Sequence, residues 1–235
     1  MRRGACSRQH KNNPAMSDSL IDILPDLWLA LGQTALMLLV SLAASVLLGG
    51  PLGVLVLLTD RGQLLQRPWL FALLNGFINV VRSFPFVILI VALVPLTRWL
   101  IGSSIGPLAA AVPLSFAAIP YFARLVEQSL REVPRGVVEA AEAMGASVPQ
   151  IVFRVLLVEA RSGLVLGLTV MAVSLLSYTA VAGVVGGGGI GDLAIRYGYY
   201  RFQTNVMLLT VAVLVAIVQA IQFSGNRIAG RLDKR

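Results

Sequence analysis

Residues 124–161 read RLVEQSLREVPRGVVEAAEAMGASVPQIVFRVLLVEAR, and long uncharged stretches flank them on both sides. This segment holds 10 of the chain's 30 charged residues in 38 positions. The flanking stretches, residues 99–123 and 162–191, each exceed the ~20 apolar residues that a helix needs to cross a bilayer. A connection between two membrane helices could be far shorter, so we expect the segment to have a role of its own.

The pattern within this segment predicts helices separated by stops. Pro134 suits the start of a helix, and Gly145 is a natural C-terminal stop. Ser147 followed three residues later by Gln150 predicts a capping box. The short helix between Pro134 and Gly145 is amphipathic: one face carries Arg135, Glu139 and Glu142, and the other carries Val137, Val138, Ala141 and Met144.

Small residues make this short helix suitable for close approach by another protein. A flat surface of alanine and glycine with flanking charges favours docking into a partner's groove over catalysis. The alternative is a solvated helix that lies on lipid headgroups, and the residues alone leave both interpretations open. The small residues are Ala140, Ala141, Ala143, Gly145 and Ala146.

The rest of the chain has the composition of a membrane protein. Hydrophobic residues make up 57%, charged residues 13%, and the mean hydropathy is +0.82. Soluble domains carry about a quarter charged residues, so an ordinary soluble fold is excluded. A strand-like alternation is absent, which excludes a membrane β-barrel. Five spans are predicted from the apolar runs 27–59, 68–97, 99–123, 162–191 and 202–226, the second interrupted only by Arg82.

The distribution of positive charge predicts the orientation in the membrane. Leaving aside Arg82 and the four basic residues among the first fifteen, the side that holds residues 124–161 and the C-terminus carries eleven Arg and Lys residues, against three on the other side. The positive-inside rule therefore places that side in the cytoplasm and the N-terminus outside. The net charge is +8. The basic residues lie singly between apolar runs and do not cluster on one polar face, which excludes a nucleic-acid-binding protein.

Scarce residues exclude several kinds of chemistry. From Met16 onward the chain has no Cys or His, and no Lys before Lys234. Metal sites built from Cys and His, a Cys or Ser/His nucleophile and a Walker-type lysine are therefore excluded. A secondary transporter usually needs a titratable group within the membrane, but the acids fall in predicted loops or near span ends, which disfavours that alternative. A membrane enzyme is also disfavoured, because the chain lacks an obvious constellation of nucleophile and base.

The motif Glu139-Ala140-Ala141-x3-Gly145 resembles the EAA motif of ABC importer permeases. Several further stretches are similar to the methionine-importer permeases of that family, and the likeness covers about residues 31–228. The family pattern ends in a proline where this chain has Val158, so Ser162-Gly163 is expected to supply the bend. The stretches are Arg82-Ser-Phe-Pro-Phe-Val-Ile-Leu-Ile, Gly102-Ser-Ser-Ile-Gly106, Val112-Pro-Leu, Ala143-Met-Gly-Ala, Gly186-Gly-Gly-Gly-Ile-Gly191, Arg196-Tyr-Gly-Tyr and Gln222-Phe-x-Gly-Asn-Arg-Ile.

This resemblance implies an all-α membrane protein with the type I ABC importer permease fold, five transmembrane helices and a cytoplasmic coupling helix. It implies a tail at residues 1–27, of which 1–15 are interpreted as an upstream-start extension. A permease domain at 28–228 and a cytoplasmic tail at 229–235 complete the layout. The expected spans are residues 34–58, 71–97, 103–124, 163–186 and 203–225, with the coupling loop at 127–161.

The resemblance also implies a function and partners. The chain would be the permease subunit of an ATP-driven importer that moves methionine, L or D, across the inner membrane by alternating access; a permease for another small amino acid is the alternative. It would work with a second copy of itself, two ATPase subunits and an external methionine-binding protein. It would bind no cofactor or metal, since ATP and Mg²⁺ would belong to the ATPase. The ATPase-coupling residues would be Glu139, Ala140, Ala141, Met144, Gly145 and Ala146.

Residues outside the coupling loop are candidates for the translocation path. Arg82 is the only charge within a span, and an intramembrane charge is functional by default; the neighbouring Ser83 and Pro85 predict a local break. The alternative is that Arg82 caps a helix end near the interface. Small polar groups in the fourth span either line the path or bond between helices. The candidates for the path and gate are Arg82, Pro85, Met171, Ser174, Tyr178 and Val181.

Glycines predict close packing and a compact turn. The runs Gly49-Gly-Pro-Leu-Gly53 and Gly163-Leu-Val-Leu-Gly167 space small residues so that helix backbones can approach closely within the bundle. Gly186, Gly188 and Gly191 form a formal GxGxxG, but no strand precedes it, so nucleotide binding is excluded. We expect these three glycines to form a compact external loop or gate after the fourth span.

Overall fold

The computed structural model describes residues 15–233, and the regular elements in that part of the chain are all helices. Four of them are long and apolar enough to cross a membrane, and a bent pair makes a fifth candidate. The first is α1 (Ala15–Ala44), which continues through a π-helical turn into α2 (Gly50–Thr59). The others are α6 (Pro107–Arg131), α10 (Arg161–Ala182) and α12 (Thr204–Leu232).

The bent pair replaces the straight second span that the apolar run alone would suggest. Helix α3 (Pro68–Ser83) and α4 (Phe86–Ala92) meet at an angle of 102°, and α5 (Val94–Ile101) follows. The break falls at Phe84 and Pro85, which have extended backbone. The local break predicted beside Arg82 is confirmed, since a proline disfavours helical backbone at the residue before it.

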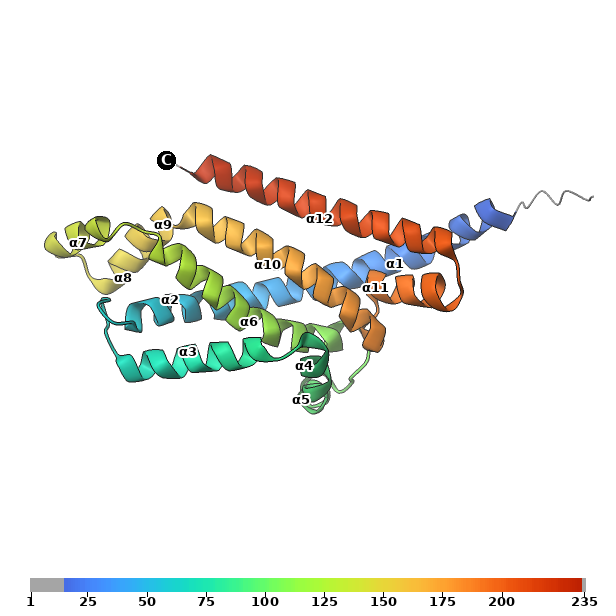
Figure 1. Ribbon diagram of the computed structural model, residues 1–235, viewed down its shortest axis with the longest axis horizontal. Helices are drawn as coiled ribbons and strands as arrows, with labels where there is room; N and C mark the ends of the chain where they lie inside the picture. Colours follow the sequence, from blue (N-terminus) through green and yellow to red (C-terminus); the bar gives the residue numbers. More distant parts are fainter. Residues whose placement is uncertain (1–14, 234–235) are drawn as a thin grey trace, which may run out of the picture.

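Helix α6 is the centre of the bundle, with α1, α2, α3 and α10 packed around it (Figure 1). Glycines allow these close approaches. A Cβ added at Gly49 would lie 2.5 Å from the carbonyl oxygen of Ile119, and one added at Gly163 would lie 3.1 Å from Ser129 Oγ. Both small-residue runs therefore face α6, and the prediction of tight packing within the bundle is confirmed.

The two ends of the bundle differ. Helix α7 (Arg135–Ala143) and the short α8 (Val148–Gln150) lie at the end where α12 finishes. The start of α1 lies at the opposite end, and the short α11 (Gly189–Leu193) packs against the middle of α1 (Figure 1). The described chain therefore begins at one end of the bundle and finishes at the other, as an odd number of spans requires.

The structure differs from the expected boundaries in several places. Residues 15–27 of the expected tail are helical, and Asp26 accepts a 2.5 Å hydrogen bond from the Tyr197 hydroxyl; residues 1–14 lie outside the described part. Helix α12 continues through residues 229–232 of the expected C-terminal tail. Helix α6 continues to Arg131, beyond the expected end of the third span at residue 124.

The expected bend at Ser162-Gly163 is wrong. Both residues lie within α10, and the helical path is instead interrupted at Ala160, which has φ −81° and ψ 0°. The interruption follows α9 (Leu157–Glu159) directly. This chain therefore breaks the helix close to Val158 without the proline, and the glycine at 163 serves packing against Ser129.

Candidate functional site

Helix α7 is held at the end of the bundle by its two termini. Pro134 precedes its first residue with φ −60° and ψ 131°, so the proline starts the helix as predicted. At the other end Gly145 adopts φ +78°, and its N–H donates to Glu142 O while the N–H of Ala146 donates to Ala141 O. These two bonds form a Schellman stop. The capping box is also present: the Ser147 N–H donates to Gln150 Oε1 at 2.8 Å.

The apolar residues of α7 do not share one environment. Ala141 is buried and Val138 is half-buried, so these two hold the helix against the bundle. Val137 and Met144 were expected on the same apolar face, but they are 42% and 81% exposed.

The exposed side of α7 therefore combines small and apolar residues with the charged Arg135, Glu139 and Glu142. It presents Gly136, Val137, Ala140, Ala143 and Met144 to the surroundings, with Glu139 and Glu142 also exposed. Of the expected coupling residues, Glu139, Ala140, Met144 and Gly145 are accessible to a partner. Ala141 is 4% exposed and Ala146 is half-buried, so these two position the helix from within.

A cavity of about 370 Å³ lies behind α7. Its walls are the side of α7 that carries Val138, Glu139 and Glu142, the loop at residues 62–64 and the end of α6. Arg131 of α6 lines the same cavity. The cavity lies beside the contact that Ala141 and Val138 make with the bundle core.

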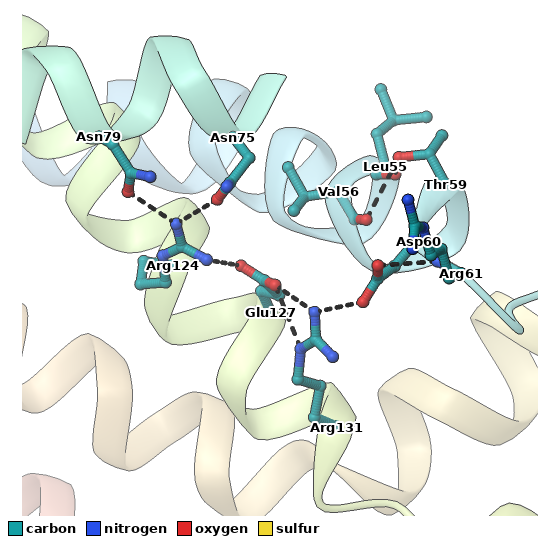
Figure 2. A network of polar contacts seen from close by, with 10 residues as sticks. All are labelled: Leu55, Val56, Thr59, Asp60, Arg61, Asn75, Asn79, Arg124, Glu127 and Arg131. Carbon is teal, nitrogen blue, oxygen red and sulfur yellow. Dashed lines mark hydrogen bonds and ion pairs between the residues drawn. The ribbon is translucent and has the colours of Figure 1, made fainter. Parts of the chain in front are cut away.

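Beside this cavity lies a set of polar residues that we name the Glu127 cluster: Asp60, Asn75, Asn79, Arg124, Glu127 and Arg131 (Figure 2). The Glu127 side chain is only 3% exposed and lies between two arginines of its own helix. Arg124 Nη1 donates to Glu127 Oε2 at 2.5 Å, and Arg131 Nη2 donates to Glu127 Oε1 at 2.8 Å. Glu127 was expected at the start of the coupling loop, and its burial does not follow from the sequence pattern.

Each arginine also reaches a neighbouring helix. Arg124 Nη2 donates to Asn75 Oδ1 at 2.5 Å and to Asn79 Oδ1 at 2.9 Å on α3. Arg131 Nη2 donates to Asp60 Oδ2, at the end of α2, at 2.7 Å. Burial alone would raise the pKa of the Asp60 carboxyl, but the bonds from Arg131 and from the Arg61 N–H outweigh it and hold the pKa below its usual value. The cluster thus connects α2, α3 and α6.

The candidate path residues are only partly brought together. The Tyr178 ring of α10 stacks on Phe86, the first residue of α4, with ring centroids 4.7 Å apart. It therefore lies next to Pro85 at the bend. The Arg82 guanidinium is exposed and lies 5.6 Å from the centroid of the Tyr121 ring. This cation–π contact supports a structural role for Arg82 at the end of α3.

The other candidates on α10 have mixed positions. Met171 is fully buried in the core, and Val181 is half-buried. The Ser174 hydroxyl donates to the carbonyl of Val170 at 3.0 Å, and Ser177 donates to that of Val173 at 3.4 Å. Both hydroxyls bond within their own helix. The alternative that the small polar groups of this span bond to another helix therefore does not hold for Ser174 and Ser177.

The glycine segment after α10 is a compact turn packed into the bundle. Gly186, Gly188 and Gly189 have positive φ, and the Gly106 N–H donates to Gly186 O at 2.9 Å. Gly191 is buried, and an added Cβ there would overlap the backbone of Ala180. The start of α11 is held by α1: Gly189 N–H donates to Gln33 Oε1 at 2.8 Å and Ile190 N–H to Thr34 Oγ1 at 2.9 Å. Gln33 and Thr34 could not be predicted as partners of this turn, because they lie 156 residues away along the chain.

Comparisons with known proteins agree with this geometry. The sequence profile of a family described as "Binding-protein-dependent transport system inner membrane component" matches residues 49–235. The chain is 45% identical over 203 residues to the probable D-methionine transport system permease protein MetI of Vibrio cholerae, covering 86% of this chain and 90% of that one. It is 41% identical to the methionine import system permease protein MetP of Bacillus subtilis, covering 77% and 82%.

A solved structure is similar over nearly the whole chain. It is described as an inward-facing conformation of the MetNI methionine ABC transporter. The similarity has a TM-score of 0.89 at 40% sequence identity and covers 91% of this chain and 99% of that one.

Proposed function

Since the chain belongs to the family of binding-protein-dependent transport system inner membrane components, we propose that it is the permease subunit of an ATP-driven methionine importer. The observation that carries this proposal is α7, a short helix presented outside the bundle by a proline start and a Schellman stop. Methionine is proposed as the substrate because relatives of 45% and 41% identity are named as methionine permeases.

The chain carries no hydrolytic machinery in this proposal. ATP and Mg²⁺ belong to separate ATPase subunits, and two of these dock on a pair of permease chains, one on each α7. The exposed residues Val137, Ala140 and Met144 form the docking surface, and Ala141 holds the helix to the bundle. An external methionine-binding protein delivers the substrate at the opposite end. The glycine turn at residues 186–191 lies at that end and is the proposed gate.

The proposed orientation places α7 in the cytoplasm of a cell with an inner membrane. Two observations support it. Positive residues are concentrated at the end of the bundle where α7 lies, as the positive-inside rule requires for a cytoplasmic end. The described chain also begins and finishes at opposite ends of the bundle (Figure 1), so an inside C-terminus implies an outside N-terminus.

Alternating access then needs α7 and the substrate path to move together. ATP binding brings the two ATPase subunits toward each other and carries the two α7 helices with them. The bend between α3 and α4, where Tyr178 stacks on Phe86, is the proposed place where the path opens and closes. Pro85 fixes the bend there.

Uptake into liposomes tests this function. The chain is reconstituted with its ATPase and binding protein, and labelled methionine uptake is measured with ATP or ADP supplied to the ATPase. We expect uptake only with ATP and binding protein together, with unlabelled L- or D-methionine competing better than other small amino acids. Uptake driven by a proton gradient without ATP would contradict the proposal. Stronger competition by another amino acid would contradict only the assignment of methionine as the substrate.

A further inference from the structure

The Glu127 cluster lies between α7 and the bend of the second span. On one side, Arg131 lines the cavity behind α7 together with Glu139 and Glu142. On the other side, Arg124 is bonded to Asn75 and Asn79 of α3. Helix α3 ends at Ser83, directly before the bend. The cluster is therefore a continuous chain of ion pairs and hydrogen bonds from the α7 cavity to the helix that carries the bend (Figure 2).

Fixed geometry explains this cluster better than stability does. A buried ion pair often contributes no more stability than apolar residues of the same volume, although removing one partner is strongly destabilising. Arginine holds its partners in a planar fork, and here each arginine bonds both Glu127 and another helix. This arrangement fixes α2 and α3 against α6 in one relative position.

Apolar packing reinforces the same three helices. Val56 of α2, Ile78 of α3 and Ala123 of α6 are fully buried and form one small core cluster. At the end of α3, Arg82 lies over the ring of Tyr121 of α6. Rigid, contiguous elements of this kind can carry a displacement between distant sites.

We infer that the Glu127 cluster makes the end of α2, α3 and α6 one body. A displacement of α7, whose Ala141 belongs to the same buried core as Leu57 and Leu130, reaches the bend between α3 and α4 through this body. This inference rests on the proposed function. Glu127 is a positioning residue, since it acts by holding Arg124 and Arg131. Without the cluster, ATP hydrolysis still moves α7, but α3 follows less closely, because only the apolar contacts and the Arg82–Tyr121 contact still hold it to α6.

The test separates ATP hydrolysis from transport in the reconstituted importer. The double variant Asn75→Ala/Asn79→Ala removes the link to α3 and leaves every charge of the cluster in place. We expect its ATP hydrolysis to stay within about twofold of wild type, while methionine transported per ATP falls roughly five- to tenfold, the lower part of the usual range of coupling between sites. Glu127→Gln should lower the same ratio, provided that the variant assembles.

The matched control is Glu132→Gln, which removes an exposed carboxylate just beyond Arg131 and should leave the ratio unchanged. A wild-type ratio in the double asparagine variant would overturn the inference, and so would a failure of that variant to assemble, because the cluster would then serve folding alone. Wild-type uptake is measured in the same preparation. A wrong substrate assignment therefore shows itself in the wild type, whereas a wrong inference shows itself only in the variants.

Discussion

Gly53 illustrates how single residues determine the packing of this bundle. A Cβ added there would overlap the carbonyl oxygen of Ala123 and lie 2.8 Å from Val126 Cβ. Backbone atoms cannot move aside as the end of a flexible side chain can. The contact between α2 and α6 therefore requires glycine at this position.

The variant Gly53→Ala should destabilise the protein by about 1–3 kcal/mol, the usual effect of overpacking a tight core. Its control is Gly76→Ala on α3, where an added Cβ meets nothing within 4 Å. That change should be neutral, or stabilising by up to ~1 kcal/mol from helix propensity. Denaturant titration of the purified protein in detergent measures both values. Equal effects of the two variants would contradict the packing argument.

The sequence predicted the residue-scale packing only where the pattern is local. The small-residue runs at 49–53 and 163–167 indicated close contact, but the pattern did not name α6 as the shared partner. The burial of Glu127 was missed because its network includes Asp60, Asn75 and Asn79, which are distant in sequence. The spacing of Arg124, Glu127 and Arg131 at i, i+3 and i+7 was the available signal, since these positions share one face of a helix.

At the scale of elements, α7 depends on its two ends. Its start and stop were predicted from Pro134 and Gly145, because a proline and a glycine at those positions act through local backbone geometry. Its apolar residues were predicted to share one face, and within that face Ala141 is buried whereas Val137 and Met144 are exposed. A helical pattern gives the angle between residues but not which part of an apolar face meets the bundle, and that depends on the tertiary contact of α7 with residues 151–156.

The variant Gly145→Val should weaken docking of the ATPase. Gly145 has φ +78°, and a side chain in this left-handed region costs roughly 1–2 kcal/mol, which corresponds to about a tenfold loss of affinity if the cost falls on the docked form of α7. The control is Gly145→Asn, because asparagine tolerates that backbone conformation. Titration of the ATPase subunit onto the immobilised permease measures the affinity. Equal affinity of the valine and asparagine variants would show that the helix stop does not determine docking.

At the scale of the whole molecule, the count of spans followed from the apolar runs, and the bend in the second followed from Ser83 and Pro85. The break at Ala160 could not be predicted, because no residue there is a helix breaker. The direction of the chain after this break is determined by the packing of α10 against α6 and α12 (Figure 1). Sequence similarity and physics therefore agree on the fold, while helix interruptions depend on tertiary contacts.

Labelling of single cysteines tests the proposed orientation of the whole chain. Cys6, the one native cysteine, is replaced by serine, and Gln66→Cys or Ser103→Cys is introduced at an exposed position. A membrane-impermeant maleimide should label the cysteine at 103 in intact spheroplasts and the one at 66 only after permeabilisation. The reverse pattern would place α7 outside and contradict the positive-inside argument.

The central claim is that α7 is the place where an ATPase subunit docks, and cross-linking in the native membrane tests it most directly. A photo-crosslinking amino acid replaces Met144, which is 81% exposed on α7, or Trp99, which is 80% exposed on α5. The account predicts a covalent adduct with the ATPase subunit from position 144 and none from position 99. Cross-links from position 144 to lipid alone, in cells that produce the ATPase, would contradict it.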